Sequence, residues 1–443
     1  MSTLWQDVEL KKRDRLYGKT KADCTVIGAG MAGLMTAFEL EKRGFSVVVL
    51  EAGRTASGAT AKTTAKITAQ HGPIYDKLTS KHGLSSAKLY FESNTQGIDK
   101  YERLIREMNI DCDFKRMPAY IYGKNSAYEI RKEAQAADKI GAMYKYTSRT
   151  SLPFEVKGAL RFENQAQFHP LRFVKAICEN LQIYENTPVI DIEDGKVTTM
   201  QGEVQTHYIV NTTHYPIINL PGLYFLRQHQ ERSYCVGVKT EKRLDGMYLG
   251  IDEVKSFRNY EEGIIIGGEK HRTGNNSEGG CLCRLRDFAN KCYPKGELVS
   301  EWSNQDAMTH DGVPFIGRFS VFAPRMFVAT GFNKWGMSLS SVASDLIADL
   351  ICGKKNEYEK LYTPNRVKLR ASFSSFAVDA GYSVKGLAEG LLSSKEKRCT
   401  HLGCRLKENK DEGTLECPCH GSQFDRDGRV VFSPANKDIR RDE

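Results

Sequence analysis

Four cysteines and two histidines lie close together near the C-terminus of this 443-residue chain, between Cys399 and His420. Cys399 and His401 form a C-x-H pair, Cys417 and His420 form a C-x-x-H pair, and fifteen residues separate the two pairs. Thiolates and neutral imidazoles are ligands for zinc and for iron–sulfur clusters. This density of ligands in two short segments predicts a metal centre.

The sequence around these ligands favours one of the two metals. The segments "CTHLGC" (399–404) and "CPCHGSQF" (417–424) resemble the Rieske family almost letter for letter, and zinc modules rarely carry such flanks. The resemblance implies a 2Fe-2S cluster in which two thiolates hold one iron and two imidazoles hold the other. The implied cluster ligands are Cys399, His401, Cys417 and His420, and the implied disulfide joins Cys404 to Cys419.

Two further positions of the resemblance bear on the reduction potential. Rieske potentials span about −150 to +300 mV, against about −400 mV for plant-type ferredoxins, because imidazole ligands carry no negative charge. Ser422 matches the residue whose hydroxyl donates to a cluster sulfide in high-potential members, which would raise the potential. Phe424 stands where the highest-potential members have tyrosine, so one such donor is missing.

A second chemical motif lies near the N-terminus. Gly28, Gly30 and Gly33 form G-x-G-x-x-G after the apolar segment "DCTVIG" and at the start of the helical pattern "AGMAGLMTAFELEKRG". Glu51 ends the next apolar segment, eighteen residues past Gly33. Glycines at these positions allow a tight turn, a close approach to a pyrophosphate and helix–strand packing, and an acidic residue can accept from ribose hydroxyls. The pattern predicts a dinucleotide site at a helix N-terminus.

The loop after Glu51, "EAGRTASGATAKTTAK", resembles the FAD-dependent amine and amino-acid oxidoreductases of the glycine oxidase and D-amino-acid oxidase type. "NQAQFHPLRFV", "TPVIDIEDG" and "ATGFNKWGMSLSSVASDLIADLI" follow in the family's order. Lys62 stands where some relatives carry a covalently flavinylated histidine, so we expect non-covalent FAD. The resemblance implies FAD contacts at Gly28, Gly30, Gly33, Glu51, Ala52, Thr60, Thr63, Thr64, Val189, Gly331, Phe332, Trp335, Gly336 and Met337.

Residues that act on the substrate are less clearly marked. Trp335, Lys334 and His271 are the candidates, Trp335 as a contact to the flavin face. Arg232, Tyr234 and His310 lie in segments that could line the same pocket. For any single one of these residues, a place in the core or on the surface is the more common alternative.

These signals predict an α/β FAD-binding Rossmann-type domain with a βαβ unit and a mixed sheet, an antiparallel-sheet substrate domain, and a small all-β Rieske domain. We expect an N-terminal arm at 1–20, the FAD-dependent oxidoreductase at 21–365, a linker at 366–392 and an abridged Rieske domain at 393–443. The nucleotide-binding part comprises about 21–90, 160–220 and 305–365, and the substrate part about 91–159 and 221–304.

Charge and hydropathy exclude some partners. The 64 Lys and Arg residues are interspersed with 55 Asp and Glu residues, and a net charge of +9 spread in this way indicates a solvated surface rather than a nucleic-acid groove. The N-terminus has no apolar signal core and no apolar run is long enough to span a bilayer. We therefore expect a cytoplasmic protein with neither a nucleic-acid nor a membrane partner.

Together the motifs predict an enzyme that oxidises an amine or amino acid to an imine. Flavins accept electron pairs as hydride whereas Rieske clusters accept single electrons, so the fusion would feed an external one-electron carrier such as a ferredoxin or flavodoxin. In one alternative the cluster feeds the flavin of a reductase or monooxygenase. In the other, the chain is an electron-transfer or redox-sensing module without its own substrate. No second G-x-G-x-x-G is present, which argues against an NAD(P)H domain.

Overall fold

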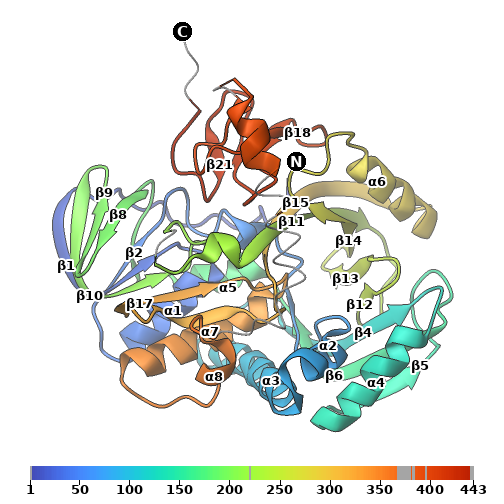
Figure 1. Ribbon diagram of the computed structural model, residues 1–443. Coiled ribbons are helices and arrows are strands. Elements are labelled where there is room, and N and C mark those ends of the chain that lie inside the picture. The colour runs from blue at the N-terminus through green and yellow to red at the C-terminus, as the bar shows by residue number, and fades with distance from the viewer. Residues whose placement is uncertain (1, 219–220, 367–380, 382–384, 395–396, 440–443) are drawn as a thin grey trace.

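The computed structural model describes residues 2–218, 221–366, 381, 385–394 and 397–439. Three sheets organise these residues (Figure 1). The first sheet has the order β16-β17-β10-β1-β2-β7, with the β8–β9 hairpin attached to β10. Its strands are β1 (Gly18–Ile27), β2 (Val47–Leu50), β7 (Gln182–Tyr184), β8 (Val189–Glu193), β9 (Lys196–Thr199), β10 (Gly202–Asn211), β16 (Phe315–Ser320) and β17 (Ala323–Thr330).

The centre of this first sheet is parallel. Strand β1 pairs in parallel with β2 and β10, and β10 pairs in parallel with β17, whereas β9 and β16 add antiparallel edges. The mixed sheet predicted from the βαβ pattern is confirmed. Parallel strands end at one edge, so the carboxyl ends of β1, β2, β10 and β17 lie together, where nucleotide ligands bind in such sheets.

The second sheet has nine strands in the order β15-β11-β14-β13-β12-β4-β6-β3, with β5 paired to β6. It is antiparallel, as predicted, except at the parallel pair β12–β4. A parallel pair is possible here because β4 and β12 are joined by a long stretch of chain rather than by a hairpin turn. The strands are β3 (Lys66–Ile67), β4 (Lys115–Gly123), β5 (Tyr144–Thr147), β6 (Gly158–Gln167), β11 (Gln228–Lys239), β12 (Met247–Gly250), β13 (Ser256–Tyr260), β14 (Gly263–Arg272) and β15 (Glu297–Thr309).

Helices cover both sheets. They are α1 (Met31–Lys42), α2 (Ile74–His82), α3 (Leu84–Glu107), α4 (Tyr128–Ile140), α5 (Pro170–Ile177), α6 (Cys281–Cys292), α7 (Gly336–Ile351) and α8 (Glu359–Tyr362), with short 3₁₀ turns η1 (Ala59–Lys62) and η2 (Tyr224–Leu226). Among the described residues, none of these helices is both long and apolar enough to cross a membrane.

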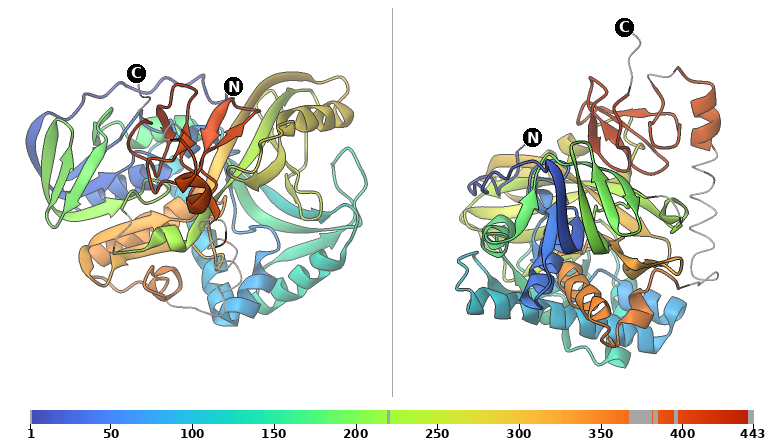
Figure 2. Two further views of the ribbon diagram at one scale, coloured as in Figure 1. Left: turned by 45° about the horizontal axis from the view of Figure 1, so that its top comes forward. Right: turned by 90° about the vertical axis from the view of Figure 1, so that its left-hand side faces the viewer.

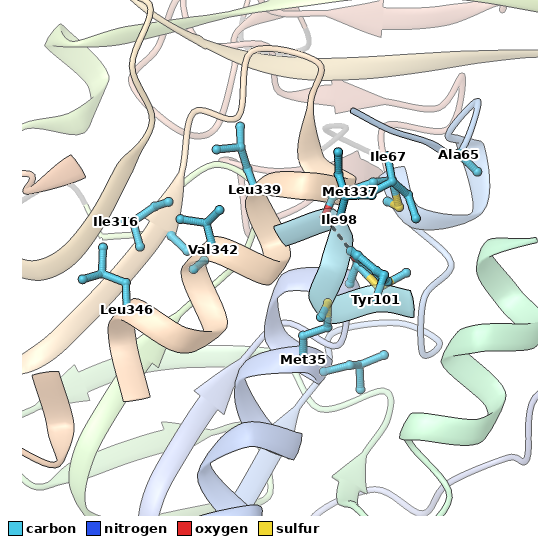
Figure 3. Close-up of a cluster of buried hydrophobic side chains, with 14 of the residues drawn as sticks. Met35, Ala65, Ile67, Ile98, Tyr101, Ile316, Met337, Leu339, Val342 and Leu346 are labelled. Atoms are coloured by element: carbon cyan, nitrogen blue, oxygen red, sulfur yellow. Dashed lines mark hydrogen bonds between the residues drawn. The ribbon is translucent and has the colours of Figure 1, made fainter. Parts of the chain in front are cut away.

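The main core lies where α1, α3 and α7 meet. Met35, Ile98, Val342 and Leu346 are almost fully buried there, and the Tyr101 hydroxyl donates to the carbonyl of Met337 at 3.0 Å (Figure 3). Apolar side chains that recur every three or four residues place these three helices face to face. This packing fixes the start of α7 relative to α1, the two helices that border the cofactor pocket described below.

The C-terminal domain is a four-stranded antiparallel sheet in the order β18-β19-β20-β21. Its strands are β18 (Lys407–Asn409), β19 (Thr414–Glu416), β20 (Gln423–Phe424) and β21 (Val430–Phe432). The small all-β domain predicted from the ligand loops is confirmed. In the described chain before Cys399, residues 385–391 are helical, and most of the predicted linker at 366–392 lies outside the described residues.

The C-terminal domain sits on the oxidoreductase domain, above β11 and β15 (Figures 1 and 2). The N-terminal arm packs beside it against the same body. Trp5 of the arm is only 3% exposed, and its indole N–H donates to the Thr63 carbonyl at 2.9 Å. The arm thereby reaches the loop predicted to contact FAD.

Candidate active site and metal centre

One large pocket, of about 670 Å³, opens at the carboxyl ends of β1 and β2. Sites for small molecules and cofactors are usually about 300–1,000 Å³ in size. The oxidoreductase domain supplies most of its wall, including the predicted residues Gly28, Gly30, Glu51, Ala52, Thr60, Thr63, Val189, Gly331, Phe332, Gly336 and Met337. Segments that are far apart in the sequence thus converge on the place where a dinucleotide is expected.

The glycine turn fits this role by geometry. Gly28 has φ +102°, a conformation that side chains disfavour, and an added Cβ would lie 2.9 Å from the Thr212 carbonyl oxygen. At Gly33 an added Cβ would lie 1.9 Å from the Gly28 carbonyl oxygen. Gly30 is the N-cap of α1, and the N-terminus of a helix favours a negatively charged group such as a pyrophosphate. The turn therefore requires glycine for close helix–strand packing.

Replacing Gly33 by alanine is expected to yield mostly FAD-free protein. The added methyl group overpacks the turn, which destabilises the fold by about 1–3 kcal/mol. Gly58→Ala is the matched control, because Gly58 lines the same pocket but an added Cβ meets nothing within 4 Å. The FAD-to-protein ratio and the unfolding midpoint measure both effects. Full FAD content in Gly33→Ala would contradict the assignment of this turn.

Glu51 is held rigidly at the pocket. Its two carboxylate oxygens accept from the backbone N–H groups of Ala29 at 2.8 Å and Gly53 at 2.9 Å. Burial raises the pKa of this carboxyl, while the backbone donors act in the opposite direction. Each oxygen keeps a further lone pair, so Glu51 can still accept from a ribose hydroxyl.

Four of the residues predicted for FAD binding or catalysis are not part of this pocket wall: Gly33, Thr64, Trp335 and His271. Trp335 stacks on His71 with ring centroids 4.3 Å apart and an interplanar angle of 12°. His71 is buried, bonds to Tyr90 and Thr68, and burial lowers its pKa to about 3. The neutral imidazole of His71 thus packs against one face of the Trp335 indole. No sequence motif predicts this contact.

Lys334 does line the pocket, and its surroundings favour the charged ammonium form of its side chain. Its ammonium lies 3.3 Å from carboxylate oxygens of both Glu231 and Asp306. Burial disfavours the charged ammonium, but the two acids outweigh burial and raise the pKa of Lys334. The pKa of Glu231 is lowered to about 2, because hydrogen bonding to His229 and the nearby lysines outweigh the effect of burial. Lys334 is therefore a positive charge at neutral pH rather than a proton acceptor.

His271, Arg232 and Tyr234 lie at the interface with the C-terminal domain. His271 bonds to the Tyr234 hydroxyl at 3.2 Å, and that hydroxyl also accepts from Asn409 of the C-terminal domain at 3.1 Å. Arg232 binds Glu412 at 2.6 Å and Glu416 at 3.2 Å, both from the C-terminal domain. These residues join the two domains, because β11 and β14 extend beneath the C-terminal sheet.

The four predicted cluster ligands are brought together by two loops of the C-terminal domain. The rings of His401 and His420 have centroids 5.2 Å apart. Cys399 and Cys417 are 2% and 1% exposed, and a hydrogen bond from the neighbouring Cys417 thiol lowers the pKa of Cys399. Burial lowers the pKa of His401 to about 4, so its imidazole is neutral, as a metal ligand must be. Two adjacent thiols and two neutral imidazoles fit the donor set of a Rieske cluster.

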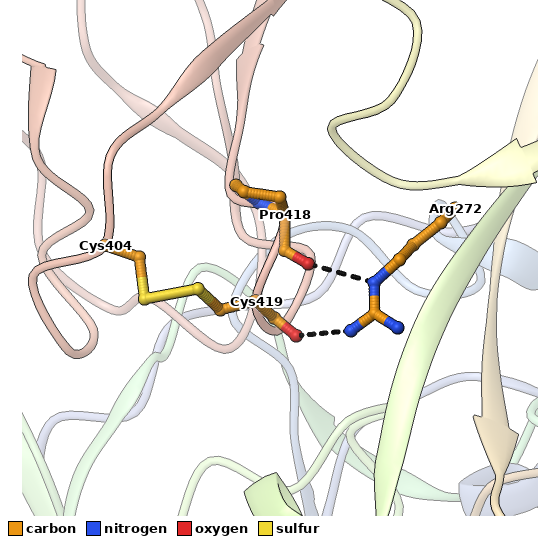
Figure 4. The surroundings of a disulfide bond; sticks show 4 residues. All are labelled: Arg272, Cys404, Pro418 and Cys419. Carbon is orange, nitrogen blue, oxygen red and sulfur yellow. Dashed lines mark hydrogen bonds between the residues drawn. A yellow bond between two sulfur atoms is a disulfide. The ribbon is translucent and has the colours of Figure 1, made fainter. Parts of the chain in front are cut away.

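Cys404 and Cys419 form a disulfide that ties the two ligand loops together (Figure 4), as the resemblance implied. The sulfur atoms of Cys404, Cys417 and Cys419 lie within 4.8 Å of one another. Because two of these sulfurs are bonded to each other, Cys417 is the thiol of this group that remains for iron. The disulfide thus lies directly beside the predicted cluster site.

Side chains of the oxidoreductase domain donate hydrogen bonds to backbone carbonyl groups of the second ligand loop, the loop that carries Cys417 and His420. Arg272 donates to the carbonyls of Pro418 at 3.1 Å and Cys419 at 3.4 Å (Figure 4). Gln230 donates to the His420 carbonyl at 2.7 Å, and Gln305 to that of Gly421 at 2.8 Å. The side chains of two strands and the end of a third therefore position the loop that carries Cys417 and His420.

Comparison with known proteins agrees with a flavin-dependent oxidoreductase that carries an iron–sulfur domain. Residues 23–350 match the FAD dependent oxidoreductase family, and residues 370–441 match the Rieske [2Fe-2S] domain. The chain belongs to the FAD dependent oxidoreductase family and carries a C-terminal Rieske domain; its cofactors are FAD and a 2Fe-2S cluster.

One relative shares both domains. The protein YhfW of Bacillus subtilis (strain 168), named for a Rieske 2Fe-2S iron-sulfur centre, is 35% identical, with 99% of this chain and 97% of YhfW covered. Glycine oxidase from Geobacillus kaustophilus superposes with a TM-score of 0.66 at 18% identity, covering 79% of this chain and 99% of that chain. L-proline dehydrogenase from P. horikoshii superposes with a TM-score of 0.64 at 20% identity, covering 79% and 98%. These two structures establish the fold.

Proposed function

We propose that the chain is a cytoplasmic dehydrogenase of amines or amino acids that passes electrons singly through its Rieske cluster to an external carrier, such as a ferredoxin or flavodoxin. The oxidised product would be an imine. The fold-level likeness to glycine oxidase and L-proline dehydrogenase supports a substrate with an amino group, because both enzymes are named for amino acids.

The observation that carries the proposal is the short link between the cluster loop and the FAD pocket. The His420 ring lies 6.3 Å from the Tyr215 ring and 5.9 Å from the Phe225 ring. Tyr215 follows His214, which lines the pocket. A predicted iron ligand thus packs against Tyr215, the sequence neighbour of a residue in the pocket wall, a placement suited to electron transfer within one chain.

Bound FAD would supply the two-electron chemistry and the cluster the one-electron chemistry. The residues at the pocket contribute charge. Lys334 holds a positive charge beside the carboxylate of Asp306 in the pocket wall. We assign Lys334 an electrostatic role toward a substrate carboxylate or toward the negative charge that develops on the cofactor, and no role as a base.

The test is an anaerobic titration of the purified protein with N-methylated amines, primary amines and amino acids. One compound is expected to bleach the FAD absorbance, after which the EPR signal of the reduced cluster rises. With a one-electron acceptor such as oxidised ferredoxin present beside oxygen, we expect a peroxide yield well below one per substrate oxidised, because the electrons leave through the cluster to that acceptor.

Two outcomes would contradict the proposal. If no compound bleaches FAD while reduced ferredoxin reduces the cluster and then FAD, electrons run inward and the chain is a reductase or monooxygenase. If FAD and cluster exchange electrons but no substrate of any kind is turned over, the chain is an electron-transfer module.

A further inference from the structure

One side of the FAD pocket comes from the Rieske domain. Besides the nucleotide-binding segments, the pocket is lined by part of β21 and the segment that follows it, here called the Rieske wall and comprising Val430, Val431, Phe432, Ser433, Ala435, Asn436 and Asp438. The wall faces residues of the glycine turn, of the loop after β2 and of the start of α7. A pocket made by the oxidoreductase domain alone would be open on this side.

Phe432 makes the direct contacts across the pocket. Its ring packs edge-on against the His214 ring, with centroids 5.7 Å apart at 86°. The Lys62 ammonium lies over the same ring at 5.7 Å from its centroid. Both Lys62 and His214 line the pocket. One side chain of the Rieske domain thus touches two separate parts of the flavin site.

The Rieske wall is also tied to both cluster loops. The Ala435 N–H donates to the hydroxyl of Ser422, two residues after His420, at 3.1 Å. The Thr400 hydroxyl, between Cys399 and His401, donates at 2.6 Å to the carbonyl of Lys437, which lies between the wall residues Asn436 and Asp438. Ser422 is fully buried, so this bond is shielded from water. The conformation of the wall therefore depends on the loops that hold the cluster.

We infer that the Rieske wall is part of the FAD-binding site, so that retention of FAD depends on the docked Rieske domain. The wall offers an aromatic ring and valine side chains for apolar contact, and Ser433 and Asn436 for hydrogen bonds to the cofactor. The inference concerns retention of FAD and holds whichever substrate is oxidised and whichever way electrons flow.

The first test compares FAD release from full-length variants. Phe432→Ala is expected to release FAD at least about tenfold faster than the wild type, as followed by the fluorescence of free FAD after dilution. Phe322→Ala is the matched control, because Phe322 is 84% exposed on the oxidoreductase domain, and its release rate should equal that of the wild type. Equal release rates for folded Phe432→Ala and wild type would overturn the inference.

A second measurement needs no substitution. Hydrogen exchange of the full-length protein is compared after FAD has been removed and after FAD has been added back. Peptides that cover 430–438 are expected to exchange more slowly when FAD is present, together with those that cover the glycine turn. Protection of the glycine turn without protection of 430–438 would also overturn the inference.

Discussion

Replacing His401 by asparagine is expected to abolish the EPR signal of the Rieske cluster and to slow reduction of a one-electron acceptor on the order of a hundredfold or more. The half-buried, neutral imidazole of His401 is one of only two histidine ligands that such a cluster uses, and an amide does not replace it. Reduction of bound FAD by substrate, followed anaerobically by stopped-flow absorbance, should stay within about threefold of the wild-type rate, because His401 is not part of the pocket wall.

The His401 variant is informative because its loop is not the one held at the interface. The second ligand loop accepts hydrogen bonds from Arg272, Gln230 and Gln305, whereas His401 belongs to the first ligand loop. Rates are normalised to bound FAD, so that loss of cofactor is not mistaken for loss of electron transfer. His207→Asn, the same change at an exposed histidine of β10, is the control. Unchanged acceptor reduction without a cluster would contradict outward flow through it.

The parts of the site that could be predicted from sequence are those whose geometry is local. The glycine turn and its partner strand form one βαβ unit, and each ligand loop spans only a few residues. The close contact between Gly33 and the Gly28 carbonyl oxygen requires glycine at position 33. Binding of iron requires the side chains of Cys399 and His401. Both requirements can be recognised in the sequence without knowledge of the fold.

The parts that could not be predicted depend on contacts between distant segments. Arg232 was a candidate for the substrate pocket, but its partner Glu412 is 180 residues away in the sequence. His271 likewise faces the domain interface, and its role in catalysis stays a prediction. The Rieske wall carries no motif, since apolar and small residues after the last ligand are common in any β domain. Only the docked arrangement assigns these residues to an interface or a cofactor site.

Replacing Arg232 by alanine is expected to lower the free energy of unfolding of the docked protein by about 3–5 kcal/mol, the usual result of breaking a buried ion pair from one side. The Arg232 side chain is 2% exposed, and its partners Glu412 and Glu416 are 9% and 0% exposed. Without the guanidinium, two buried carboxylates keep their desolvation cost and lose their counter-charge. Denaturant unfolding followed by the visible circular dichroism of the cluster measures the loss.

Two comparisons isolate the ion pair from the general effect of shortening an arginine. Arg325→Ala breaks a pair with Asp194 in which both side chains are at least half exposed, and it should cost at most about 1 kcal/mol. The triple change Arg232→Met, Glu412→Gln and Glu416→Gln should recover most of the lost stability, because removing all the buried charges also removes their desolvation cost. If the triple variant were as unstable as Arg232→Ala, the arginine would act through its bonds to Ser303 and Gln305 within the oxidoreductase domain rather than by holding the Rieske domain in place.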